Sequence, residues 1–169
     1  MTDRVAIRRL PTGVPGLDQI LGGGLPEFSF NLIVGSPGAG KTTLAHQIMF
    51  ALATPERRAV YFTVVGEPPL KMLRYQQQYE FFDLKQVGES IRFVSVGQDI
   101  VNGTLDQLLE RIIAEVETTN PGLVFVDSFR TVSQVAEGSR DGGLNLQSFV
   151  QQLAIRLTGW EATTFLIGE

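Results

Sequence analysis

Short apolar runs alternate with longer amphipathic stretches along this chain. Each run is long enough for a buried strand and too short for a helix. We expect five strands, at residues 30–34, 59–65, 91–96, 123–128 and 163–167. We expect helices between them, at residues 43–53, 70–82, from 105 to the break at 120–122, and 144–157. Strands that alternate with helices favour a parallel sheet covered on both faces, so the predicted fold class is α/β.

The helix predicted after Thr104 has the clearest amphipathic pattern in the chain. Its apolar residues fall on one stripe, namely Leu105, Leu108, Leu109, Ile112, Ile113 and Val116. Thr104 and Gln107 have the spacing of a capping box, which marks the start of a helix. Asn120-Pro121-Gly122 ends it. We therefore expect this helix to pack one face against the sheet.

The segment before the first strand is rich in turn-forming residues. Residues 11–21 predict a turn and a short helix, which stops at Gly22-Gly23-Gly24. With 169 residues the chain suits one domain. We expect residues 1–29 to lead into a core formed by residues 30–169.

Composition excludes several kinds of site. The chain has no cysteine and one histidine, which argues against disulfides, thiolate chemistry and histidine metal sites. No apolar run approaches the length of a membrane span, and Met-Thr-Asp-Arg is not a secretory start, so we expect a cytoplasmic protein without a membrane partner. The net charge of −4 disfavours a broad nucleic-acid surface. We interpret His46 and Trp160 as packing or interface residues.

A glycine-rich loop follows the first predicted strand directly. Residues 35–42 read Gly-Ser-Pro-Gly-Ala-Gly-Lys-Thr and match the phosphate-loop pattern G-x-x-x-x-G-K-[ST] at every fixed position. The glycines let successive N–H groups point into one concavity, and the next helix adds its positive end. An ordinary glycine turn would not require a strand before it and a helix after it. We therefore predict nucleotide binding at Gly35, Ser36, Pro37, Gly38, Ala39, Gly40, Lys41, Thr42 and Thr43.

Acidic residues stand at the carboxyl ends of other predicted strands, where ligands bind in such sheets. Asp127 closes four apolar residues, and we expect it to hold Mg²⁺ opposite Thr42, although Asp at a strand end is also a common turn former. Glu67 follows the second strand and is a candidate catalytic base for a water that attacks the γ-phosphate. A glutamate at the start of a helix, favoured by the helix dipole, is an equally good reading of Glu67. Glu169 is either a γ-phosphate contact or a frayed last residue.

The chain resembles the KaiC-like branch of the RecA superfamily of P-loop ATPases. The resemblance rests on the phosphate loop and on segments before and after it, which together span essentially the whole chain. These segments are Thr12-Gly13-Val14-Pro15-Gly16-Leu17-Asp18, Gly22-Gly23-Gly24-Leu25-Pro26, Glu67-Pro68-Pro69, Phe82-Asp83-Leu84, Val124-Phe125-Val126-Asp127-Ser128 and Thr163-Thr164. The N-terminal segment at this spacing is more specific than the phosphate loop, which many NTPases share.

The resemblance implies a RecA-like core with strand order 3-2-4-5-1. It also implies ATP and Mg²⁺ as ligands, and a homo-oligomeric ring, usually a hexamer, with ATP between subunits. By the same resemblance Lys41 and the glutamate after the second strand serve catalysis, and Thr42 and Asp127 serve the metal.

Two departures from the family pattern bear on function. The family usually has paired glutamates after the second strand, and Gly66 occupies the first of these positions. Relatives also continue past residue 169, with further strands beside the phosphate-loop strand and basic residues that reach a neighbour's ATP. We therefore expect a C-terminally shortened core, less able to form the ring or turn over ATP. Its phosphate-loop strand would become a sheet edge, which proteins normally protect.

Three functions follow from these observations. The leading one is an ATPase that couples hydrolysis of Mg-ATP to assembly or signalling, with Glu67 orienting water and Lys41 stabilising charge. A second is an ATP-dependent scaffold with little hydrolysis, which Gly66 favours. A third is a RadA-like ATPase of DNA recombination or repair, which shares the Leu17-Asp18 and Gly22-Gly23-Gly24 pattern and which the acidic balance disfavours.

Overall fold

The core of the protein is a parallel five-stranded sheet. A computed structural model describes residues 6–64, 69–97, 104–128, 132 and 145–168. The strands are β3 (Phe30–Val34), β4 (Ala59–Thr63), β5 (Ile91–Ser95), β6 (Leu123–Asp127) and β7 (Thr163–Gly168). They lie in the order β3-β7-β6-β4-β5, and every neighbouring pair is parallel. Numbered along the chain, this is the predicted order 3-2-4-5-1, which is confirmed.

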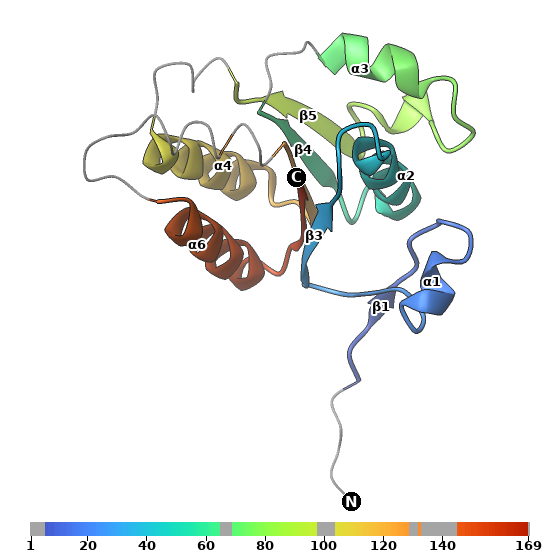
Figure 1. Ribbon diagram of the computed structural model, residues 1–169, viewed down its shortest axis with the longest axis horizontal. Coiled ribbons are helices and arrows are strands. Elements are labelled where there is room, and N and C mark those ends of the chain that lie inside the picture. The colour runs from blue at the N-terminus through green and yellow to red at the C-terminus, as the bar shows by residue number, and fades with distance from the viewer. Residues whose placement is uncertain (1–5, 65–68, 98–103, 129–131, 133–144, 169) are drawn as a thin grey trace, which may run out of the picture.

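Helices cover both faces of this sheet. The helices α2 (Lys41–Leu52) and α3 (Pro69–Gln76) lie on one side, and α4 (Leu105–Thr119) and α6 (Leu146–Gly159) lie on the other (Figure 1). Alternate residues of each strand therefore belong to different cores. In β4, Val60 and Phe62 pack with α4 and α6, whereas Ala59 and Tyr61 pack with α2. Burial on both faces explains why the strands read as continuous apolar runs.

The ends of the helices follow the local sequence but differ from prediction at several points; α6, for example, spans Leu146–Gly159 rather than residues 144–157. Thr104 and Gln107 form the expected capping box, and α4 ends with Asn120 in the left-handed conformation. The helix α2 begins at Lys41 rather than at residue 43, because Gly40, with φ 85°, already serves as its N-cap. The helix α3 ends at Gln76, before the predicted residue 82, and turns follow it.

The N-terminal segment forms a small unit of its own. The strands β1 (Arg9–Leu10) and β2 (Leu25–Pro26) pair antiparallel around the short helix α1 (Leu17–Ile20). Asp18 Oδ1 accepts hydrogen bonds from the backbone N–H and the hydroxyl of Thr12, both at 2.8 Å. Gly24 has φ 109°, and a Cβ there would collide with the Leu10 carbonyl, so this glycine is required by packing as well as by conformation.

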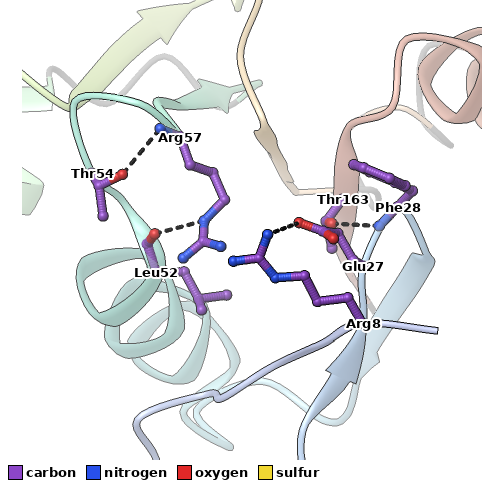
Figure 2. A network of polar contacts seen from close by, with 7 residues as sticks. All are labelled: Arg8, Glu27, Phe28, Leu52, Thr54, Arg57 and Thr163. Atoms are coloured by element: carbon purple, nitrogen blue, oxygen red, sulfur yellow. Dashed lines mark hydrogen bonds and ion pairs between the residues drawn. The ribbon is translucent and has the colours of Figure 1, made fainter. Parts of the chain in front are cut away.

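Polar contacts tie this unit to the amino edge of the sheet, at the opposite end from the phosphate loop. Phe28 N–H donates to Thr163 Oγ1 at 2.8 Å, and Arg8 Nη1 lies 3.8 Å from Glu27 Oε1 (Figure 2). Nearby, Arg57 Nε donates to the Leu52 carbonyl at 2.9 Å, which fixes the turn between α2 and β4. Both positive and negative side chains line this edge, so its local charge is balanced.

The strand β3 is an edge strand, as the family strand order predicted. In the described part of the chain it pairs with β7 alone. Leu32 and Val34 are consequently 63% and 65% exposed, although their sequence reads as buried strand. None of the helices in the described ranges combines the length and apolar character needed to cross a bilayer.

The exposure of β3 can be tested with two leucines that are paired in register on the neighbouring strands β3 and β7. Leu32 and Leu166 are partners in the β3–β7 register, but Leu166 is only 1% exposed. We expect Leu166→Ala to lower the free energy of unfolding by about 2–5 kcal/mol, because it opens a cavity in the core. Leu32→Ala should change it by about 0.5 kcal/mol or less. Urea unfolding at neutral pH measures both, and similar losses in the two variants would contradict the assignment of β3 to an exposed edge.

Candidate functional site

The loop between β3 and α2 curls around an open hollow. Gly38 and Gly40 adopt φ values of 76° and 85°, which side chains rarely tolerate. Ala39 N–H donates to the Ser36 carbonyl at 3.2 Å and closes the turn that contains Pro37. The hollow has a volume of about 290 Å³ and is lined by Gly38, Gly40, Lys41, Thr42 and Thr43. It lies at the N-terminus of a twelve-residue helix, where backbone N–H groups and the helix dipole favour an anion.

Lys41 lies over the start of this loop. Its ammonium donates to the carbonyl oxygens of Gly35 at 2.6 Å and Ser36 at 2.8 Å. These bonds hold a positive charge within the loop at the beginning of α2. The ammonium is therefore placed beside any anion that enters the hollow.

Thr42 connects the loop to the carboxyl end of β6. Its hydroxyl donates to Asp127 Oδ2 at 2.8 Å, across 85 residues of sequence. The same oxygen accepts a hydrogen bond from the Tyr61 hydroxyl at 2.7 Å. Helix α2 and strands β4 and β6 therefore each supply one side chain to a single cluster.

A second hollow adjoins the first at Thr42. It has a volume of about 360 Å³ and is lined by Thr42, Thr63, Met72, Tyr75, Gln76, Asp127 and Ser128. Thr63 and Gln76 are buried, and among the described residues the Thr63 hydroxyl and the Gln76 carbonyl oxygen have no hydrogen-bond partner. A buried polar atom without a partner costs about 1–3 kcal/mol, which is typical of positions that bind water or ligand.

Burial controls the protonation of two side chains behind Asp127. It raises the pKa of Tyr61 well above 10, and the negative charge and hydrogen bond of Asp127 add to this effect, so the phenol remains a donor. Burial lowers the pKa of His46 from 6.5 to about 4, against the opposing effects of Gln76 and Asp127. The His46 ring lies edge-on to Tyr61 at 4.7 Å between centroids. His46 thus packs in the core as a neutral ring, in line with its interpretation as a packing residue.

The family of this chain follows from its sequence along almost its whole length. A family model described as "ATPase: KaiC" matches residues 10–169. The chain belongs to the KaiC ATPase family.

Individual relatives agree with this assignment. The DNA repair protein RadA of Mycobacterium tuberculosis is 32% identical over 95% of this chain, and a UPF0273 protein of Saccharolobus solfataricus is 27% identical over 96% of it. A crystal structure of a KaiC-like protein from Pyrococcus horikoshii OT3 matches with a TM-score of 0.73 at 23% identity, over 97% of this chain and 72% of that one. The chain spans only 31% of the RadA relative and 61% of the UPF0273 relative.

The structure brings together most of the residues that the sequence singled out in this KaiC-family chain. Residues 35–43 form one loop and helix start, and Asp127 reaches Thr42. Gly66, Glu67 and Glu169 lie outside the described residues. Tyr61 escaped sequence analysis, because it reads as one more apolar residue of a buried strand. Its only signal was the phenol itself, because a buried hydroxyl needs a hydrogen-bond partner.

The donors at Thr42 and Asp127 fit Mg²⁺ as the KaiC family implies. A hydroxyl and a carboxylate are hard oxygen ligands of the kind Mg²⁺ prefers. Among the described residues no group of three or more His, Asp or Glu side chains converges to form a complete protein cage. Such a sparse donor set suits a cation that shares its coordination with phosphate groups.

The low pKa of His46 has a consequence for stability. Between about pH 6.5 and pH 4 the unfolded chain binds a proton at His46 that the folded chain does not, so stability falls as the pH falls through this range. We expect His46 to account for a loss of about 2 kcal/mol between pH 7 and pH 5. Urea unfolding of the wild type and of His46→Leu at pH 7 and pH 5 isolates the contribution of His46 to the free energy of unfolding. An equal pH dependence in the two proteins would contradict it.

Proposed function

We propose that this chain binds ATP at the loop between β3 and α2 and hydrolyses it with Mg²⁺. The observation that carries the proposal is the Thr42–Asp127 hydrogen bond, which joins the loop to the neighbouring strand end. This contact brings an anion hollow, an ammonium group and a carboxylate to one edge of the sheet. Membership of the KaiC ATPase family supports the same activity.

In this proposal Lys41 exchanges its acceptors when the nucleotide binds. Its ammonium donates to two neutral carbonyl oxygens, of Gly35 and Ser36. Phosphate oxygens carry charge, and hydrogen bonds to charged acceptors are roughly twice as strong as neutral ones. Lys41 and the loop N–H groups would then stabilise the charge that develops on the γ-phosphate during transfer.

Thr42 and Asp127 would hold Mg²⁺ through their side-chain oxygens. When bound, the cation neutralises charge on the phosphates and orients them for in-line attack. Asp127 ends β6 directly beside Thr63 at the end of β4, so the chain after β4 starts at the same edge. Glu67 follows four residues later and is proposed to orient and deprotonate the attacking water. Ring assembly with ATP between subunits, and a role in assembly or signalling, belong to the same proposal.

The proposal can be tested by replacing Lys41 and a second lysine that does not line the hollow. We expect Lys41→Ala to abolish the binding of a fluorescent ATP analogue and the release of phosphate, because it removes the only ammonium at the hollow in the described residues. Lys85→Ala replaces an exposed lysine in the short 3-10 helix Leu84–Gln86 before β5, and it should leave both unchanged. Equal phosphate release by wild type and Lys41→Ala would rule out catalysis at this loop. Binding without release by the wild type would instead favour the scaffold function, to which Gly66 points.

A second candidate function is a RadA-like role in DNA recombination or repair. The observation in its favour is the name of the relative that is 32% identical over 95% of this chain, a DNA repair protein. The net charge of −4 counts against a broad nucleic-acid surface. We expect no binding of labelled single-stranded DNA at physiological salt with Mg-ATP present, measured by fluorescence anisotropy. Binding that weakens steeply as salt is raised would revive this function.

A further inference from the structure

The carboxylate of Asp127 is held by two hydroxyl groups of different kinds. Tyr61 and Thr42 both donate to Oδ2, at 2.7 and 2.8 Å. Thr42 belongs to the first turn of α2, where the proposed function needs its oxygen for the cation. Tyr61 comes from the middle of β4 and approaches the carboxylate from within the core. The two donors are therefore not equivalent.

The Tyr61 ring is fixed on several sides. It is fully buried. It stacks on Phe125 at 5.8 Å between centroids with 16° between the planes, and it contacts Phe93 at 5.5 Å. His46 meets it edge-on at 4.7 Å. Because these aromatic neighbours restrict rotation of the ring, its hydroxyl remains within hydrogen-bond distance of Asp127.

We propose that Tyr61 is a positioning residue for the divalent cation, an inference that rests on the proposed function. Its hydroxyl holds the Asp127 carboxylate in the orientation that binds the cation, without touching the cation or the nucleotide. The Thr42 oxygen would be shared between the cation and Asp127, whereas the Tyr61 hydroxyl donates to Asp127 from the core and would hold the carboxylate independently of the cation. Groups that orient a metal ligand in this way typically change metal affinity by about 10–100-fold when they are removed.

The test replaces only the phenolic oxygen. Tyr61→Phe keeps the ring and its packing, and Mn²⁺ binding to the full chain with ADP present is followed by electron paramagnetic resonance. We expect the dissociation constant for Mn²⁺ to rise about 10–100-fold, while binding of ADP without a cation changes less than about twofold, since the loop is intact. Tyr79→Phe is the matched control, because Tyr79 is 45% exposed and stacks on Phe81 away from Asp127.

Asp127→Asn supplies the second variant and shows whether Tyr61 acts through the carboxylate. In that background, adding Tyr61→Phe should change Mn²⁺ affinity no further. An unchanged dissociation constant for Mn²⁺ in Tyr61→Phe overturns the inference. So does an equal loss of Mn²⁺ affinity when Tyr61→Phe is added to the wild type and to Asp127→Asn. A Tyr61→Phe variant that circular dichroism shows to be unfolded also overturns it. If the wild type binds neither ADP nor Mn²⁺ with ADP, the proposed function itself fails. By contrast, if the wild type binds ADP and Mn²⁺ and Tyr61→Phe binds them equally well, the proposed function stands and only the role of Tyr61 is ruled out.

Discussion

The hydrogen bond from Thr42 to Asp127 depends on β3 and β6 running in the same direction within the sheet. In a parallel sheet every carboxyl end lies at one edge, so loops from distant parts of the sequence meet there. The phosphate loop follows β3, and Asp127 ends β6, with β7 between these strands. If β3 and β6 ran in opposite directions, the loop and Asp127 would lie at opposite edges of the sheet. The direction of the strands, more than any single contact, thus determines that an anion hollow and a carboxylate share a site.

The site also shows where the core departs from purely apolar packing. Tyr61, His46, Thr63 and Gln76 are buried within or beside the cluster that covers Phe125 and Asp127. Apolar residues at these positions would avoid the free-energy cost of polar atoms without partners. Real proteins break such packing rules mainly at functional sites. This polar burial lies beneath the carboxylate of Asp127, next to the hollow that Thr63 and Gln76 line.

The sequence predicted the architecture well because the signals were strong and local. Five apolar runs gave the strands, and the capping box at Thr104 gave the start of α4. The order of the strands came from the resemblance, since apolar runs do not reveal which strands are neighbours. Boundaries were less predictable: α2 starts at Lys41 because Gly40 can adopt the left-handed conformation of a helix cap, a property that the pattern of apolar residues does not record. The hydrogen bond of Tyr61 could not be predicted, because it depends on the register that places β4 beside β6.

The position of β3 has a consequence for the loop that it carries. Within the described residues the strand is supported on one flank only, by the ladder to β7, which extends to a 3.4 Å bond from Gly35 N–H to the Gly168 carbonyl. The rigidity of the β3 end of the loop therefore depends on a single row of backbone hydrogen bonds, those between β3 and β7. Fraying of that row would loosen the anion hollow before it disturbed the rest of the sheet. Any segment that paired with the exposed flank of β3 would add a second row of backbone hydrogen bonds, and it would make the loop more rigid from a position outside the hollow.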